Sequence, residues 1–173
     1  MSVIAVKVYD NKIEIAADSR TTYGNFANTQ QQQLDNKLFK VKDIVLGMAG
    51  YSKTQTLFKT FLESYEPTIG SIAEIYTALK EFRKWREEIC GDEEDDEKSM
   101  YAILITEGKA YIIEDYAISE VVGFAAVGSG MTEALVAFDF GATPKEAVVA
   151  AVNHNIYCSE PIIEFIVKKG KRK

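Results

Sequence analysis

The chain has 173 residues, 47% of them hydrophobic and 27% charged, which is typical of a single globular domain able to bury a sizeable core. Its net charge of −6 argues against a nucleic-acid-binding protein, because phosphate neutralisation needs a basic surface. The sequence contains no apolar run of the roughly 18–20 residues that span a membrane, and no signal-peptide pattern at its start. We therefore expect a cytoplasmic protein without nucleic-acid or membrane partners.

Cysteine spacing and charge runs give no sign of a metal or cofactor site. The two cysteines, Cys90 and Cys158, lie far apart, which fits neither a disulfide framework nor a zinc site. The acidic run at 92–97 lacks the alternating ligands and mid-loop glycine of a calcium loop, so it is interpreted as a solvated loop. The basic tail at 168–173 is interpreted as a solvated terminus. The sequence therefore predicts no metal and no cofactor.

The first fifty residues predict two β-hairpins. Four segments rich in Val, Ile and Leu form them in pairs, 2–8 with 13–17 and 38–41 with 44–48. Asp18 stands where the second of these strands ends. The polar residues that follow it, at 22–25 and 28–33, are predicted to form a loop.

Two amphipathic helices follow the second hairpin. The first is predicted to start at Ser52, with Gln55 as its capping-box partner. The second starts at a capping box of Ser71 and Glu74 and ends at Gly91. Apolar residues at helical spacing give the expected core faces, which are Leu57, Phe58, Phe61 and Leu62 in the first helix and Ile72, Ile75, Tyr76, Leu79, Phe82 and Ile89 in the second. Core packing is also expected for Trp85.

The second half of the chain predicts strands, then two more helices, then a final strand. The strand segments are 101–106 and 109–114, which form a hairpin, then 121–127 and 162–167. One helix is predicted through Glu133 and Phe138, and another from Thr143, which is followed by Pro144 and the capping residue Glu146. Short hairpins indicate antiparallel sheets, and paired amphipathic helices indicate an outer layer on each side. The order fits an α+β fold with four layers, an α/β/β/α sandwich formed by a single domain over residues 1–173, although periodicity alone allows other α+β folds.

The candidate chemistry begins at Ser2. A hydrolase of the usual serine-triad type needs an imidazole base, and the one histidine of the chain, His154, falls in a predicted helix where a structural role is expected. The alternative base is the α-amine of Ser2, exposed if Met1 is removed, because an α-amine has a pKa of about 7.7–8. An ammonium on Lys37 would lower the pKa of that amine and of the hydroxyl, and Asp18 could keep Lys37 charged and oriented.

Five segments in the right order resemble the proteasome β-type family, and more closely the bacterial peptidase subunits of the HslV type. They are 2–6 (SVIAV), 16–25 (AADSRTTYGN), 36–41 (NKLFKV), 47–50 (GMAG) and 126–130 (AVGSG). The resemblance implies a four-layer N-terminal nucleophile hydrolase with Ser2 as nucleophile, Lys37 tuning the site and Asp18 orienting Lys37. It further implies that the backbone N–H of Gly50 stabilises the oxyanion and that Ser129 joins the hydrogen-bond network.

The same resemblance implies how such a subunit works. It predicts a homo-oligomer of stacked rings that encloses the sites, an AAA+ unfoldase ring as a possible ATPase partner, and peptide or protein substrates. Thr21 and Met48 would lie near the first specificity pocket, which favours apolar substrate side chains.

The chain departs from the family pattern in two places. Ser2 replaces the usual threonine, and the segment 153–159 (NHNIYCS) carries no supporting carboxylate. Two alternatives therefore stay open, a non-catalytic ring or scaffold protein and a small-molecule amidase with the same N-terminal chemistry.

Overall fold

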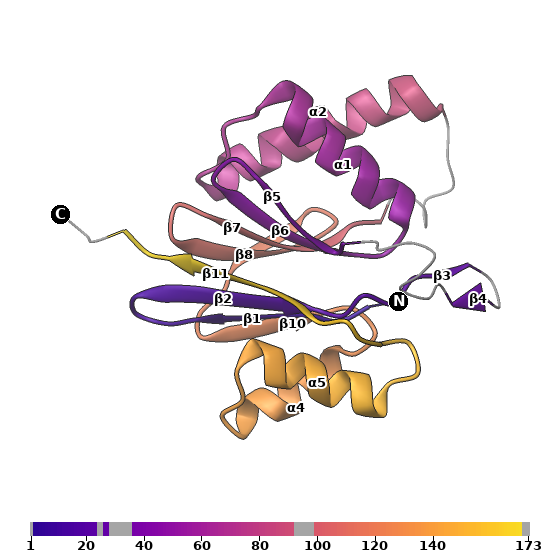
Figure 1. Ribbon diagram of the computed structural model, residues 1–173. Helices are drawn as coiled ribbons and strands as arrows, with labels where there is room; N and C mark the ends of the chain where they lie inside the picture. Colours follow the sequence, from indigo (N-terminus) through magenta and orange to yellow (C-terminus); the bar gives the residue numbers. More distant parts are fainter. Residues whose placement is uncertain (1, 24–25, 28–35, 92–98, 171–173) are drawn as a thin grey trace.

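Two stacked β-sheets form the centre of the molecule, and a pair of helices covers the outer face of each (Figure 1). This arrangement is seen in a computed structural model, which describes residues 2–23, 26–27, 36–91 and 99–170. Three apolar clusters fill the spaces between the four layers, one between the sheets and one beneath each helix pair. The predicted α/β/β/α sandwich is therefore confirmed.

The first sheet holds the start and the end of the chain. Its antiparallel order is β10-β1-β2-β11, and its strands are β1 (Ile4–Val8), β2 (Lys12–Ala17), β10 (Phe124–Val127) and β11 (Ile163–Lys168). The register pairs Ile4 with Ala17 on one side and with Val127 on the other. The first residues of the chain are thus placed between the end of β2 and the end of β10.

The second sheet has the antiparallel order β5-β6-β7-β8-β9. Its strands are β5 (Leu38–Val41), β6 (Ile44–Ala49), β7 (Tyr101–Thr106), β8 (Lys109–Glu114) and β9 (Ala117–Glu120). The two hairpins predicted in this sheet, β5 with β6 and β7 with β8, are confirmed.

The predicted continuous strand at 121–127 is wrong in its first half. The chain leaves the second sheet when β9 ends at Glu120, passes Gly123 at a φ of +87°, and enters the first sheet at Phe124. Val121 is buried with the residues between the two sheets, so the apolar pattern continues through the crossing and conceals it. The strand β9 was missed because it is only four residues long and mostly exposed, without a buried apolar run.

A separate, short two-stranded sheet follows β2 in the chain, formed by β3 (Thr22–Tyr23) and β4 (Phe26–Ala27) (Figure 1). The prediction of a loop at 22–25 is therefore wrong at its first two residues. The rest of that loop, the polar run at 28–33 and the acidic run at 92–97 lie outside the described residues.

Most central strands are buried on both faces. In β1, Ile4 and Val6 pack between the sheets, whereas Ala5 packs against the helices of the outer layer. In β6, Val45 faces the other sheet and Met48 faces the helices. Because both faces are covered, these strands are mostly apolar, and a polar–apolar alternation is weak.

The helices are α1 (Ser52–Tyr65) and α2 (Ile72–Cys90) over the second sheet, and α4 (Met131–Asp139) and α5 (Pro144–His154) over the first. The predicted capping boxes of α2 (Ser71 with Glu74) and of α5 (Thr143 with Glu146) are confirmed. The predicted capping box of α1 is wrong. Its N-cap is Tyr51, without a side-chain cap, and Gln55 Nε2 instead donates to the carbonyl of Gly50 at 3.3 Å.

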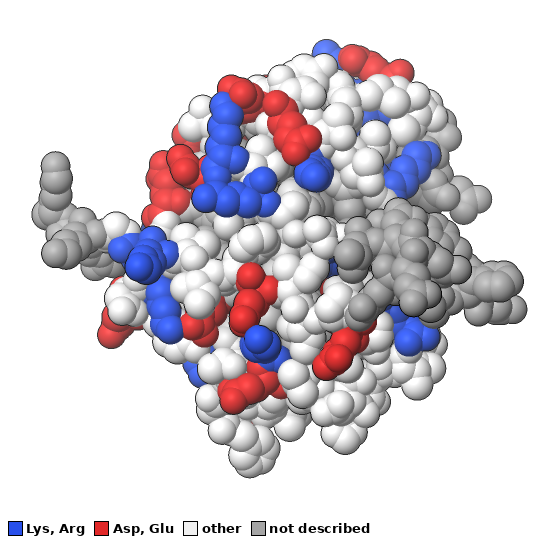
Figure 2. Space-filling view, viewed as in Figure 1, with Lys and Arg blue, Asp and Glu red and all other residues white. Residues whose placement is uncertain are grey.

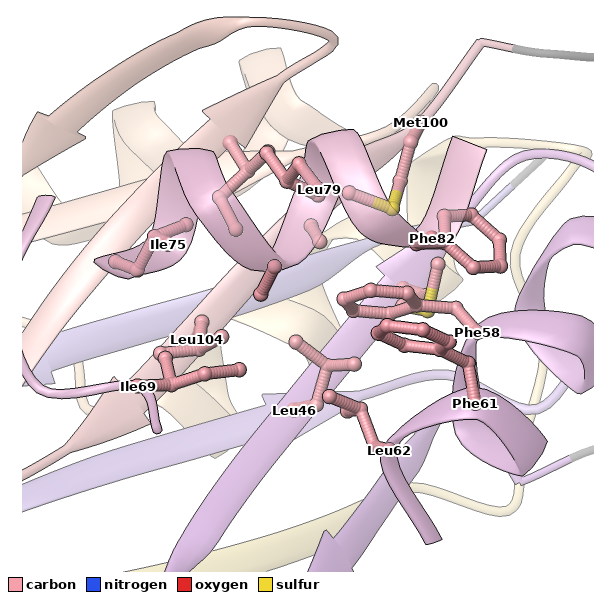
Figure 3. Close-up of a cluster of buried hydrophobic side chains, with 14 of the residues drawn as sticks. Leu46, Phe58, Phe61, Leu62, Ile69, Ile75, Leu79, Phe82, Met100 and Leu104 are labelled. Atoms are coloured by element: carbon pink, nitrogen blue, oxygen red, sulfur yellow. The ribbon is translucent and has the colours of Figure 1, made fainter. Parts of the chain in front are cut away.

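Phe58, Phe61 and Phe82 lie together in the core beneath α1 and α2, among a larger number of aliphatic side chains (Figure 3). Phe58 and Phe82 meet edge to face at 4.8 Å between ring centroids, and Trp85 packs against the same cluster as predicted. The expected core face of α2 is too wide, because Ile72, Tyr76 and Ile89 are 39%, 42% and 55% exposed. The buried stripe of α2 runs instead through five residues: Ile75, Ala78, Leu79, Phe82 and Arg86.

Over the described ranges 2–23, 26–27, 36–91 and 99–170, no helix has both the length and the apolar character needed to cross a bilayer.

Candidate active site

Asp18 and Lys37 form a buried ion pair between the two sheets. Asp18 follows β2 in the first sheet, and Lys37 precedes β5 in the second. Lys37 Nζ donates to Asp18 Oδ1 at 2.7 Å, and the two side chains are 3% and 0% exposed. A buried pair of this kind interacts strongly, because little water screens it. The structure thus brings together the two charged residues singled out by the sequence.

The carboxylate of Asp18 also accepts hydrogen bonds from three backbone N–H groups. Oδ1 accepts from the N–H of Val3 at 2.8 Å, and Oδ2 accepts from the N–H groups of Arg20 at 2.9 Å and Ser159 at 3.3 Å. These donors compensate for the burial of the charge. Asp18 thereby ties Lys37 both to the residue after Ser2 and to the segment after α5.

Ser129 holds both backbone polar groups of Ser2. The nitrogen of Ser2 donates to Ser129 Oγ at 3.0 Å, and Ser129 Oγ donates to the carbonyl oxygen of Ser2 at 3.2 Å. The N–H of Gly130 donates to the same carbonyl at 3.1 Å. The pairing of β1 with β10 explains this contact, because it brings the turn after Val127 beside the start of the chain. Ser2 itself is 1% exposed.

Two residues that sequence reasoning missed complete the surroundings of Ser129. Asn155, directly after α5, donates through Nδ2 to the carbonyl of Ser129 at 2.9 Å and to Glu133 Oε1 at 3.1 Å. Glu133 lies in the first turn of α4. Segment 153–159 carries no carboxylate of its own, and the carboxylate that Asn155 contacts comes from α4. The signal available within that segment was the amide of Asn155.

The remaining predicted site residues lie near the end of β6 and beyond Asp18. Gly50 directly follows β6 and is exposed, with a φ of +110°. The N–H of Met48 donates to the carbonyl of Lys37 at 2.9 Å, but the Met48 side chain is fully buried in the cluster beneath α1 and α2. Thr21 is 9% exposed. His154 is exposed in the last turn of α5.

Comparison with known proteins gives matches at the level of structure. No family model matches the chain, and no curated protein matches it in sequence. Thiobacillus denitrificans BPH matches with a TM-score of 0.87 and 20% identity over 98% of this chain and 100% of that one. Its complex with epoxomicin matches with a TM-score of 0.87 and 18% identity, over 97% and 99%. Eukaryotic HslV from Trypanosoma brucei matches with a TM-score of 0.67 and 15% identity, over 96% and 99%.

The chain has the fold of the HslV and BPH subunits. The likeness extends over nearly the whole of each chain, so the sandwich predicted from the five segments is confirmed.

Within this HslV-like fold, Gly128 allows the turn before α4 to approach Ser2. Its φ is +98°, a conformation that side-chain-bearing residues rarely adopt. A Cβ at this position would lie 2.3 Å from the carbonyl oxygen of Ser2. The glycine is therefore required both by the backbone conformation and by the contact.

We expect Gly128→Ala to destabilise the protein by about 3 kcal/mol or more, because left-handed strain adds to a steric clash. Gly123→Ala is the matched control, since Gly123 has a φ of +87° but no atom within 4 Å of its Cβ position. The control should lose about 1–2 kcal/mol from strain alone. Urea unfolding of both variants measures the difference, and equal losses would contradict the close approach of residue 128 to Ser2.

Cys158 lies beside the site as a neutral thiol. Burial, with a smaller contribution from Asp18, raises its pKa from 9.0 to about 11. The thiol is close-packed, because a Cβ on Gly130 would lie 2.8 Å from its sulfur. Both Cys158 and the half-buried Cys90 are free thiols. Among the described residues, no cluster of His, Cys, Asp or Glu could hold a metal ion.

We expect a thiol reagent at pH 8 to modify Cys90 in the folded protein and to leave Cys158 unmodified, because the reactive thiolate is disfavoured at Cys158. In denaturant both thiols should react. Peptide mass mapping after labelling identifies the modified residue. Rapid modification of Cys158 in the folded protein would show that this side of the site opens to solvent.

Proposed function

We propose that the chain is the peptidase subunit of a self-compartmentalising protease, with Ser2 as its N-terminal nucleophile after removal of Met1. One observation carries the proposal. The nitrogen of Ser2, which removal of Met1 would convert into an α-amine, lies 3.0 Å from Ser129 Oγ. The backbone N–H of the adjacent residue Val3 donates a hydrogen bond to Asp18 Oδ1, and the same oxygen accepts a hydrogen bond from Lys37 Nζ. The HslV-like fold supports this interpretation.

The proposed reaction forms and then hydrolyses an ester on Ser2. Its Oγ attacks the carbonyl carbon of the scissile peptide bond, and the α-amine takes the hydroxyl proton. Collapse of the tetrahedral intermediate breaks the C–N bond, and the proton passes from the α-ammonium to the departing amine. Water then attacks the ester with the α-amine again as base, which releases the acid product and restores Ser2.

The residues around Ser2 have distinct proposed roles. The ammonium of Lys37 lowers the pKa of the α-amine, so that the amine is neutral near pH 7, and Asp18 orients Lys37. The N–H of Gly50 stabilises the oxyanion, a contribution of about 3–4 kcal/mol for one such donor. Ser129 Oγ orients the α-amine by accepting a hydrogen bond from it. These roles follow the family resemblance and agree with the contacts of Asp18, Lys37 and Ser129.

We further propose a homo-oligomer of stacked rings in the cytoplasm, fed with unfolded protein substrates by an AAA+ ATPase ring. The fold likeness to HslV and BPH subunits supports this assembly. On the face shown in Figure 2, basic and acidic side chains are interspersed, which fits protein partners rather than nucleic acid.

The proposed substrates are peptides with apolar side chains at the first specificity pocket. Thr21, which is 9% exposed, is proposed to contribute to that pocket; the Met48 side chain was also expected there but is fully buried in the core beneath α1 and α2, so it does not line the pocket surface. Because T. denitrificans BPH forms a complex with epoxomicin, we also propose that this chain binds epoxomicin and that its peptidase activity is inhibited by it.

The test combines particle mass with hydrolysis of a fluorogenic peptide panel by the untagged protein. A ring-sized particle that cleaves peptides, and is inhibited by epoxomicin, would support the proposal. A monomer or dimer that hydrolyses small amides but no peptides would identify the amidase alternative. A ring-sized particle with an exposed Ser2 and no hydrolysis would identify a non-catalytic scaffold.

A further inference from the structure

The side chain of Asn155 is fixed by three hydrogen bonds. Its Nδ2 donates to the carbonyl of Ser129 at 2.9 Å and to Glu133 Oε1 at 3.1 Å, and its Oδ1 accepts from the N–H of Tyr157 at 3.0 Å. Its backbone N–H donates to the carbonyl of Ala151, which continues the hydrogen-bonding of α5. Asn155 therefore links α5, the first turn of α4 and the turn that holds Ser2.

Glu133 is the charged end of this link. Its Oε2 is buried without a hydrogen-bond partner among the described residues, an arrangement that is costly for a carboxylate. A first-turn acidic residue is favoured by the helix dipole, but that effect does not require burial of the carboxylate. The contact with Asn155 accounts for the position of the carboxylate, because through it Nδ2 of Asn155 uses a hydrogen that the bond to Ser129 leaves free.

We infer that Glu133 is a positioning residue of the active site, acting through Asn155 on Ser129 and thereby on the nitrogen of Ser2. This inference rests on the proposed function and deepens it. The segment after α5 carries no carboxylate at 153–159, and Glu133 supplies one from α4. The chain of contacts is continuous, from Glu133 to Asn155, from Asn155 to Ser129, and from Ser129 to Ser2.

Displacement of Ser129 is expected to change the pKa of the Ser2 α-amine. In the described residues, the charged and titratable groups of the surrounding contact network come from four segments: Asp18 and Arg20 after β2, Lys37 before β5, Glu133 in α4, and Cys158 after α5. Ser129 Oγ accepts a hydrogen bond from the Ser2 nitrogen, which favours the protonated form of an α-amine there. A displaced Ser129 should therefore lower the pKa of that amine.

The test is a double-mutant cycle in protein that begins at Ser2, with Met1 removed by a methionine aminopeptidase where it is retained. Glu133→Ala, Asn155→Ala, the double variant and Glu133→Gln are compared in kcat and KM. The α-amine pKa of each is measured by trace acetylation of Ser2 across a pH series. Each single alanine variant should lose about ten- to a hundredfold in kcat with KM little changed, and the double variant should lose no more than the singles.

Glu133→Gln distinguishes the effect of positioning Asn155 from the effect of the negative charge on residue 133. Its Oε1 still accepts from Asn155, so kcat and the α-amine pKa should stay close to those of the wild type, whereas both alanine variants should show a lowered α-amine pKa. Additive losses in the double variant, or a glutamine variant that behaves like alanine, would overturn the inference, as would variants that lose thermal stability alone. If the wild type hydrolyses no peptide, the proposed function fails, and the α-amine pKa values still decide the role of Glu133.

Discussion

Ser2→Ala should abolish peptide hydrolysis, with a loss of at least about a thousandfold in kcat/KM. The variant keeps the α-amine and the backbone contacts with Ser129 but has no hydroxyl to form the ester. Its stability should change little, because one small buried hydroxyl is removed. Burst-phase and steady-state assays on a fluorogenic peptide measure the effect.

Ser2→Thr is the matched variant for this prediction. Threonine keeps the hydroxyl and adds a methyl group that restricts its rotamers, so hydrolysis should remain within about tenfold of the wild type. Substantial hydrolysis by Ser2→Ala, at unchanged KM, would place the nucleophile elsewhere and exclude the proposed mechanism.

Lys37→Met should remove activity and also destabilise the fold. The substitution leaves the Asp18 carboxylate buried with its backbone donors but without its counter-charge. Breaking a buried pair in this way costs about 3–5 kcal/mol. Loss of the ammonium also raises the pKa of the proposed α-amine, so that less of the neutral base is present near pH 7. Urea unfolding and peptide hydrolysis measure the two effects.

Two controls keep these effects apart. Lys145→Met breaks the exposed pair with Glu164, which is 3.1 Å long, and should cost about 0–1 kcal/mol without loss of activity. The double variant Asp18→Asn/Lys37→Met removes both buried charges, so it should recover part of the lost stability and stay inactive. Full activity in a well-folded Lys37 variant would contradict the proposed role of the ammonium.

Local patterns predicted most of the fold because each was tied to a specific physical requirement. Thr143 followed by Pro144 and Glu146 satisfies the free N–H groups of a helix start, and α5 begins there. The Ser52–Gln55 pattern has the same form and fails, because Tyr51 takes the N-cap position and Gln55 reaches back to Gly50 instead. A capping motif therefore locates a helix more reliably than it locates the first residue.

The parts that sequence could not supply depend on long-range packing. The contact of Lys37 with Asp18 was expected from the family resemblance, in which Asp18 orients Lys37. The contact between Glu133 in α4 and Asn155, directly after α5, joins residues 22 apart in the sequence, and no local pattern specifies it. It arises because α4 and α5 pack on the same sheet with their site-facing ends together. The crossing between the sheets after Glu120 was concealed in the same way by the burial of Val121.

The proposed mechanism requires that Ser2 is the N-terminal residue and that its own α-amine acts as the base. The most direct test is the intact mass of the chain expressed without an N-terminal tag, measured alongside hydrolysis by the same sample. We expect a mass lower by one methionine residue, and activity that disappears when one residue is kept in front of Ser2. Peptide hydrolysis by protein that fully retains Met1 would exclude this mechanism, because the amine would then belong to the wrong residue.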